Sequence, residues 1–128
     1  MGMNYEIRRN GDVAILDLSG RLSLGEEVAF GPGSGVVLSD TIRELTKKGE
    51  KRILLNLAGV TYVDSSGVGQ LTGAFTTARK HGADLKLLNP TSQVQNLLRI
   101  TKLDTFFDIK NDEDTAVKSF TREAAAQG

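Results

Sequence analysis

Residues 55–69, LNLAGVTYVDSSGVG, decide how this chain folds. The stretch opens as the tail of an apolar run at residues 53–57, turns at residues 58–59, and continues as a second apolar patch at residues 60–63. The polar corner DSSG at residues 64–67 follows, and after it the apolar residues recur with a helical period. The pattern predicts a buried strand that leads through a polar corner into a helix.

The polar corner is suited to two different roles. The first turn of a helix carries unpaired backbone N–H groups and the positive end of the macrodipole, so the oxygens of Asp64 and Ser65 are good helix caps. The same donors would bind a phosphate, so Ser65 or Ser66 could carry a phosphoryl group with little damage to the fold. The local pattern alone leaves both interpretations open, simple caps or a phosphorylation site.

The composition indicates one globular domain. A chain of 128 residues that is 39% apolar can bury a core of ordinary size. The 16 basic and 16 acidic side chains balance, so no strong field draws the protein to nucleic acid or to an anionic membrane. The absence of cysteine excludes a disulfide framework and a thiolate metal site. No apolar run resembles a membrane span or a signal peptide, so we expect a cytoplasmic protein.

The rest of the chain alternates between strands and helices. Asn10-Gly11-Asp12 joins two alternating segments and predicts a hairpin, and Ser92 with Gln95 predicts a capping box. The predicted strands are residues 5–9, 13–18, 52–57, 84–88 and 106–109, and the predicted helices are residues 37–48, 66–80, 93–99 and one that starts at the acidic triplet 112–114. This order predicts a single α/β domain over residues 1–128, with a mixed, mostly parallel β-sheet of about five strands and about four helices.

Two segments carry no regular pattern. Residues 20–35 contain five glycines and Pro32, a composition that breaks helices and strands and predicts an extended loop. The loop lacks the Gly-Lys-Ser/Thr end of a P-loop and the Gly-x-Gly-x-x-Gly run of a dinucleotide-binding turn, so we expect no bound nucleotide. Residues 123–128 are predicted to form a frayed tail.

The chain offers little for catalysis. Its single histidine, His81, is expected at the far end of the helix that begins near Ser65, about 22 Å away, which excludes a hydrogen-bonded Ser-His pair. The sequence has no Gly-x-Ser-x-Gly elbow, and one histidine without cysteine leaves little to bind a transition metal. The acidic triplet suits a helix start better than a metal site. We therefore expect no enzyme activity, no metal site and no cofactor, with a Mg²⁺ site made of carboxylates alone as the remaining alternative.

Several segments together resemble the STAS domain and, more narrowly, the bacterial anti-sigma factor antagonists. The segments are residues 53–57, the corner VDSSGVG at 63–69, the helix end RKHG at 79–82, residues 84–88, and the runs LSGRL at 18–22 and LLRITKLDTFF at 97–107. The resemblance covers nearly the whole chain. Its most specific part is Asp-Ser-Ser-Gly in this setting.

The resemblance implies a partner switch. The unmodified protein would bind an anti-sigma factor that is also a serine kinase, and the sigma factor would then be released to RNA polymerase. The kinase would phosphorylate the first serine of the corner, Ser65, with Ser66 and Thr61 as the nearest alternatives, and a metal-dependent serine phosphatase would reverse the modification. A protein that reserves its exposed face for a partner is expected to be a monomer. The corner residues expected to bind the partner are Asp64, Ser65, Ser66, Gly67 and Val68.

The chain departs from the family pattern in two places. Position 23 is Ser23, where many members carry an acidic residue, and this weakens any role for it in receiving the phosphoryl group. The loop of residues 23–36 is longer than usual, and we expect it to add Ser23 and Phe30 to the partner surface, with Phe30 as an exposed anchor; a decorative insertion is the alternative. The second functional hypothesis is a STAS scaffold or regulatory subunit of a signalling or transporter complex, which would bind constitutively without phosphorylation.

Overall fold

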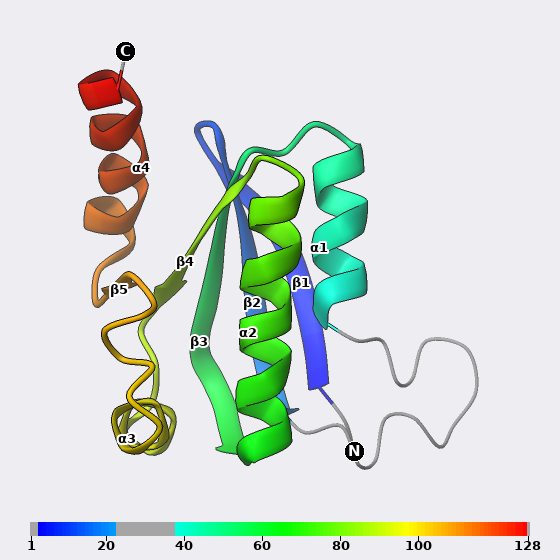
Figure 1. Cartoon of the computed structure of the whole chain (residues 1–128), viewed down its shortest axis with the longest axis vertical. Helices are drawn as coiled ribbons and strands as arrows, with labels where there is room; N and C mark the ends of the chain where they lie inside the picture. The colour runs from blue at the N-terminus through cyan, green and yellow to red at the C-terminus, as the bar shows by residue number, and fades with distance from the viewer. Residues whose placement is uncertain (1–2, 23–37, 128) are drawn as a thin grey trace.

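The computed structural model describes residues 3–22 and 38–127, and it describes the side chains of residues 5–22 and 38–120. The described residues form five strands and four helices (Figure 1). The strands are β1 (Met3–Asn10), β2 (Val13–Leu22), β3 (Arg52–Val63), β4 (Asp84–Leu88) and β5 (Ile109–Lys110). The helices are α1 (Leu38–Lys47), α2 (Ser65–Lys80), α3 (Ser92–Ile100) and α4 (Glu113–Gln127).

The strands form one mixed sheet in the order β1-β2-β3-β4-β5. β1 and β2 are antiparallel and are joined by the two-residue turn Gly11-Asp12, whereas β2, β3, β4 and β5 run parallel to one another. Gly11 has a φ of +63°, which glycine adopts without a steric penalty. The predicted α/β fold with a mixed, mostly parallel sheet is confirmed, and so is the hairpin predicted from Asn10-Gly11-Asp12.

Helices cover both faces of the sheet (Figure 1). α1 and α2 pack side by side on one face, where α2 contacts β2, β3 and β4, and α4 contacts β3, β4 and β5 from the opposite face. Consecutive residues of β3 serve the two faces in turn: Ile53 and Leu55 belong to the large core cluster, while Leu54 packs with Phe120 of α4 in a smaller one. The apolar run of this central strand is continuous because both of its faces are buried.

The turn predicted at Ala58 and Gly59 is wrong, because β3 continues through both residues to Val63. The pairing of β3 with β2 shifts register twice in this region, and each time β3 contributes one extra residue, as in a β-bulge. A Cβ atom at Gly59 would lie 2.8 Å from the carbonyl oxygen of Leu18. The small residues therefore mark a place where two backbones approach closely within a long strand, a pattern that cannot be told from a turn in the sequence.

β2 is also longer than predicted, and it takes Gly20, Arg21 and Leu22 out of the expected loop of residues 20–35. Gly20 pairs with Val60 and Leu22 pairs with Val63, and Leu22 is fully buried. The start of the predicted loop is therefore wrong by three residues. Residues 23–35, which include Ser23 and Phe30, lie outside the described residues.

The start of α3 corrects one predicted cap. Thr91 is the N-cap, and its hydroxyl accepts a hydrogen bond from the backbone N–H of Val94. The capping box predicted for Ser92 and Gln95 is therefore wrong, since Ser92 is already the first helical residue. Thr and Ser are both favourable caps, so the sequence alone could not place the boundary between them.

The other helix ends fall close to their predicted positions. α1 is described from Leu38, so its predicted start at Val37 lies outside the described residues. α2 ends at the predicted place, with His81 as its C-cap and Gly82 at a φ of +77°. α4 begins at the acidic triplet as predicted and runs through Gln127, where the sequence predicts a frayed tail.

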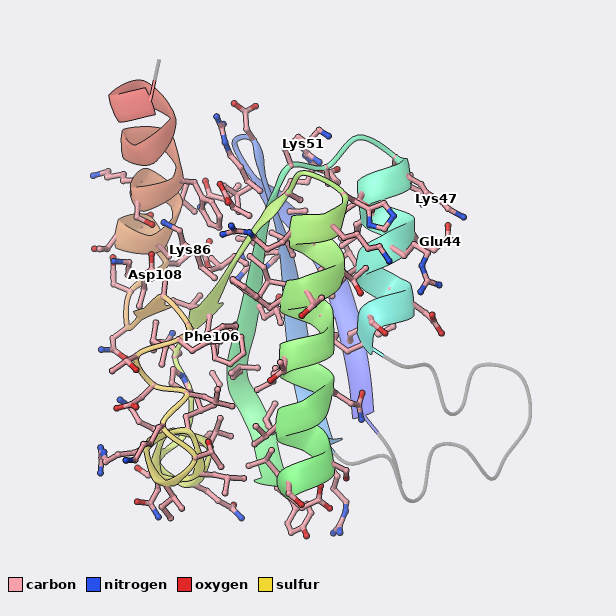
Figure 2. The ribbon with its side chains drawn as sticks, viewed as in Figure 1. Glu44, Lys47, Lys51, Lys86, Phe106 and Asp108 are labelled. Carbon is pink, nitrogen blue, oxygen red and sulfur yellow. The ribbon has the colours of Figure 1, made fainter. Side chains whose placement is uncertain are left out.

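The strand predicted at residues 106–109 is mostly wrong, because β5 contains only Ile109 and Lys110. The two phenylalanines before it pack against Phe75 of α2 instead, with ring centroids 4.8 Å (Phe106) and 5.7 Å (Phe107) from that of Phe75. Phe107 is buried, whereas Phe106 is 46% exposed and lies between the α3–β5 segment and α2 (Figure 2). Phe106 and Phe107 are therefore apolar because they pack in a cluster of aromatic rings and not because they form a strand.

A buried lysine ties α4 to the sheet. Lys86 of β4 is 3% exposed, and its Nζ donates to the Ser119 hydroxyl at 2.8 Å and lies 3.1 Å from a carboxylate oxygen of Asp108. Figure 2 shows Lys86 and Asp108 close together below α4. The ammonium group also lies 4.7 Å from the ring centroid of Phe120. The hydroxyl, the carboxylate and the ring together compensate for the burial of the charge.

Candidate functional site

The candidate site is the corner between the end of β3 and the start of α2, at the lower end of both elements in Figure 1. Asp64 is the N-cap, with an extended backbone (φ −124°, ψ −173°). Its carboxylate accepts from the backbone N–H of Gly67 at 3.0 Å, and its carbonyl accepts from the N–H of Val68 at 3.0 Å. The predicted cap is thus confirmed for Asp64, whereas Ser65 is the first residue of the helix.

Three hydroxyls lie in or near the corner, and their surroundings differ. The Ser66 hydroxyl donates to the Asp64 carboxylate at 2.6 Å, and the Thr61 hydroxyl donates to the carbonyl of Gly20 at 3.2 Å. Ser65 is exposed, and no residue within 3–22 or 38–127 makes a hydrogen bond with its hydroxyl. Ser65 is therefore the hydroxyl of the three that a large partner can reach without first breaking a hydrogen bond to a described residue.

Position 67 must be a glycine because the end of β2 lies too close to it for a side chain. Gly67 is buried, and a Cβ atom at this position would lie 1.9 Å from the carbonyl oxygen of Leu22 and 2.8 Å from a methyl group of Val63. No side chain fits in that space. Leu22, the last residue of β2 and the residue before Ser23, therefore lies directly against the first turn of α2.

The corner residues divide into exposed and supporting ones. Ser65 is exposed, and Asp64 and Ser66 are half-buried. Gly67 is buried, and Val68 is 7% exposed as part of the large core cluster. Of the five corner residues expected to bind a partner, Asp64, Ser65 and Ser66 have exposed surface, whereas Gly67 and Val68 are buried and do not offer a direct contact. Ser23 and Phe30, the two expected loop residues, lie outside the described residues.

A guanidinium stacks on an aromatic ring close to the corner, a feature that was not predicted from the sequence. Arg21 of β2 pairs in register with Tyr62 of β3, and its guanidinium lies 4.2 Å from the centre of the Tyr62 ring. Such a stack is favourable for a guanidinium. The two residues are 41 positions apart in the chain, and their contact follows from the β2–β3 register, so no local pattern could have indicated it.

The geometry keeps the imidazole of His81 away from Ser65. α2 is a continuous helix of 16 residues, which spans about 24 Å, and His81 caps its opposite end. The predicted exclusion of a Ser-His pair is therefore confirmed. In the part of the chain that the structure describes, no group of three or more His, Cys, Asp or Glu residues is placed to hold a metal ion. No helix within that part is long and apolar enough to cross a membrane.

The main charge cluster lies away from the corner and has a structural explanation. Arg8 of β1 donates to Asp17 of β2 at 2.6 Å and to Glu113 at the start of α4 at 2.6 Å. Hydrogen bonds from Arg8 and Asn10 lower the pKa of Glu113 to about 2, and the hydrogen bond from Arg8 lowers the pKa of Asp17. The guanidinium of Arg8 connects β1 to β2 and to α4. This arrangement stabilises the packing of the three elements and is not that of an acid–base pair.

Comparison with known proteins identifies the family. The family model of the STAS domain matches residues 4–116. The chain belongs to the STAS domain family. The resemblance noted in the sequence is therefore confirmed, and the match includes β1 through the start of α4 with the whole Asp64–Gly67 corner.

Among its relatives, this STAS domain is similar to anti-sigma factor antagonists. It is 26% identical over 118 residues to an anti-sigma-B factor antagonist of Bacillus subtilis, which covers 92% of this chain and 100% of the relative. It is 36% identical over 59 residues to an anti-sigma-B factor antagonist of Listeria monocytogenes, over 46% of this chain and 52% of that protein.

Solved structures show the same fold. The anti-sigma factor antagonist SpoIIAA in its unphosphorylated form is 18% identical, with a TM-score of 0.69 over 92% of this chain and 96% of that one. The phosphorylated form of the Bacillus protein SpoIIAA is also 18% identical, with a TM-score of 0.63 over 91% of this chain and 99% of that one. The fold of this STAS domain is thus one that has been seen both with and without a phosphoryl group.

Proposed function

We propose that this STAS domain is an anti-sigma factor antagonist that is switched by phosphorylation of Ser65. The unmodified protein binds an anti-sigma factor that is also a serine kinase, and the bound sigma factor is released. The kinase transfers a phosphoryl group to Ser65, which ends the binding, and a metal-dependent serine phosphatase restores the unmodified form. The protein acts in the cytoplasm as a binding partner, without an enzyme activity, a cofactor or direct contact with nucleic acid or membrane.

The observation that carries this proposal is the contrast among the three hydroxyls. Ser65 is exposed and makes no hydrogen bond to a described residue, while Ser66 is bonded to Asp64 and Thr61 to Gly20. The similarity to anti-sigma-B factor antagonists supports the choice of partner class. A kinase must bring the acceptor oxygen into line with a nucleoside triphosphate, and an exposed hydroxyl at the tip of a corner allows that approach.

The position of Ser65 also supports a switch that leaves the fold intact. Ser65 is the first residue of α2, and the first turn of α2 contains no acidic side chain. A phosphoryl group adds about −1.5 to −2 charges at neutral pH, and the amino-terminal end of a helix favours negative charge. At a docked surface the same group is bulky and strongly hydrated. The modification can thus be tolerated by the domain and still be rejected by the partner.

The proposal is tested by identifying the partner and mapping the modification. The unmodified protein is used to capture binding proteins from a lysate of the source organism, and each captured protein is incubated with the chain and ATP. The intact mass and a peptide map should then show one phosphoryl group on Ser65. Ser65→Ala should abolish the transfer, whereas Ser66→Ala and Ser92→Ala should not; Ser92 is the matched control because it is the exposed first residue of α3.

Two results would contradict the proposal. Transfer to Ser66 or Thr61 would assign the switch to a different hydroxyl. Stable capture of a partner that transfers no phosphoryl group would favour the second hypothesis, a STAS scaffold or regulatory subunit that binds constitutively.

A further inference from the structure

β1 forms an open edge of the sheet. It pairs with β2 on one side, and among the described residues no strand lies on its other side (Figure 1). It is eight residues long, and two of its apolar side chains are exposed, Tyr5 by 40% and Ile7 by 49%. They line a shallow groove together with Thr41, Glu44, Leu45 and Lys48 of α1. A long edge strand with exposed apolar side chains is a template for pairing with another strand.

The hairpin register decides which backbone groups of β1 face the open edge. Asn10 pairs with Val13 across the two-residue turn, and the pair that flanks such a turn exchanges backbone hydrogen bonds, as does every second pair after it. The N–H and C=O groups of Asn10, Arg8 and Glu6 therefore face β2. Those of Arg9, Ile7 and Tyr5 face outward, where an incoming strand can bind them.

We infer that β1 pairs in antiparallel fashion with β1 of a second copy of this chain, with Ile7 on the twofold axis, so that two five-stranded sheets form one continuous sheet. In this register Ile7 lies opposite Ile7 of the second copy. Tyr5 lies opposite Arg9, and Glu6 lies opposite Arg8. Directly opposite side chains point to the same face of a sheet. An apolar pair, two ring–guanidinium pairs and two ion pairs thus meet at the junction.

Charge selects this register over its neighbours. The outward backbone groups belong to every second residue, so the allowed registers differ by two residues in their pairing. One alternative places Glu6 opposite Glu6 of the second copy, and the other places Arg8 opposite Arg8. Like charges in directly opposite positions destabilise a strand pair. The register centred on Ile7 avoids both and replaces them with opposite charges.

The existing partners of Arg8 and Arg9 leave both side chains able to contact the second copy. Arg8 donates through Nε, Nη1 and Nη2 to Asp17 and Glu113 in four hydrogen bonds, and a guanidinium has five N–H donors. One donor therefore remains for Glu6 of the second copy, which would be the third carboxylate at that guanidinium. On the other face Arg9 is paired with Glu50, and its guanidinium plane can still stack on a ring.

The interface is small, so the dimer is weak. Pairing of one strand per protomer buries less than the roughly 1,200 Å² at which stable interfaces begin, and we expect a dissociation constant of about 0.1 mM. A monomer is the simplest expectation for a protein that reserves its exposed face for a partner, and the concentration dependence of the mass distinguishes a monomer from a weak dimer. Sedimentation velocity from about 10 µM to about 1 mM should show conversion from monomer to dimer. A monomer throughout that range would overturn the inference.

Charge reversal tests the surface. Glu6→Lys replaces the carboxylate with an ammonium group opposite Arg8 at both ends of the junction and should raise the dissociation constant about tenfold. Asp84→Lys is the matched control, because it makes the same charge change at an exposed position of β4, an interior strand, and should leave the constant unchanged. Equal effects of the two substitutions would place the dimer interface elsewhere and overturn the inference.

Cross-linking tests the register, and the absence of native cysteine means that each introduced thiol is the only one in its chain. Ile7→Cys should form an intermolecular disulfide under mild oxidation, since opposite Cα atoms in the pair would be about 5.5 Å apart. Tyr5→Cys and Arg9→Cys should each cross-link poorly alone, with symmetry-related positions about 13 Å apart, but efficiently when the two variants are mixed. Efficient cross-linking of Tyr5→Cys alone, or none with Ile7→Cys, would overturn the inference.

Discussion

The helices α2 and α4 begin with opposite uses of charge. α4 starts with carboxylates that are already engaged: Glu113 accepts hydrogen bonds from Arg8 and Asn10, and Asp112 accepts from the backbone N–H of Thr115. α2 has one capping carboxylate, Asp64, and then an exposed hydroxyl, Ser65. The preference of a helix start for negative charge is met by several carboxylates in α4 and by Asp64 alone in α2, and the proposed function adds a phosphoryl group on Ser65.

The carboxylates of α4 hold that helix against the sheet, whereas the proposed function gives Ser65 of α2 a role in partner binding. The charges of α4 connect it to β1 and β2, so changing them alters the stability of the whole domain. The free hydroxyl of α2 supports nothing in the described structure, so changing it should alter binding and not folding.

Gly67→Ala should destabilise the protein by about 3 kcal/mol, because its methyl group would overlap the carbonyl oxygen of Leu22, and backbone atoms cannot move aside cheaply. Gly69→Ala is the control two residues later, with nothing within 4 Å of the added atom. It should stabilise by about 0.5–1 kcal/mol through helix propensity. Urea denaturation measures both; similar values for the two would show that the contact between β2 and the corner is not tight.

Asp64→Ala should destabilise by about 1.5 kcal/mol, since its carboxylate holds both the Gly67 N–H and the Ser66 hydroxyl. Thr91→Ala removes the cap of α3, whose hydrogen bond to Val94 is longer at 3.4 Å, and should cost about 0.5 kcal/mol. The two values come from the same denaturation experiment. The reverse order would mean that Asp64 is kept for binding and contributes little to the fold.

Glu113→Gln should destabilise by about 1 kcal/mol at neutral pH, a value kept small because the Arg8 side chain is 41% exposed and its ion pairs are screened by solvent. The pKa of Glu113 is lowered from 4.5 to about 2. Its contribution is therefore complete above about pH 4.5 and is lost as the pH falls toward 2.

The pH dependence of the free energy of unfolding checks this prediction. The wild-type protein should lose more stability than Glu113→Gln between pH 4.5 and pH 2. Parallel curves for the two proteins would show that the α4 carboxylate is not the tie that its hydrogen bonds indicate.

Ser65→Ala should change the stability by less than about 0.5 kcal/mol, because the hydroxyl is exposed and makes no hydrogen bond to a described residue. Ser66→Ala should cost more, about 1 kcal/mol, since the Ser66 hydroxyl is bonded to Asp64. Thermal denaturation of the three proteins side by side would reveal the order. A loss for Ser65→Ala as large as that for Ser66→Ala would make Ser65 a structural residue.

The sequence predicted what periodicity and capping chemistry determine. The hairpin at Gly11, the parallel order of the later strands, the position of α2 and the cap Asp64 all follow from patterns within about ten residues. The corner could be located for the same reason, since a cap and a hydroxyl at a helix start are local features.

The errors arose where contacts between distant segments override the local pattern. Ala58 and Gly59 have the composition of a turn, yet pairing with β2 keeps them in β3. Phe106 and Phe107 suit a strand but join the ring of Phe75. The stack of Arg21 on Tyr62 depends on a register that no single stretch of sequence specifies, and it therefore escaped prediction.

The role of Ser65 as a switch is tested most directly by placing a phosphoryl group at one of two equivalent helix positions. Phosphoserine is incorporated at position 65 or at position 92, and the affinity of each form for the captured kinase is compared with that of the unmodified protein. We expect that phosphoserine at 65 weakens binding at least about tenfold, while phosphoserine at 92 changes it less than about twofold. Equal affinities of the two modified forms would contradict the claim that Ser65 is the switch.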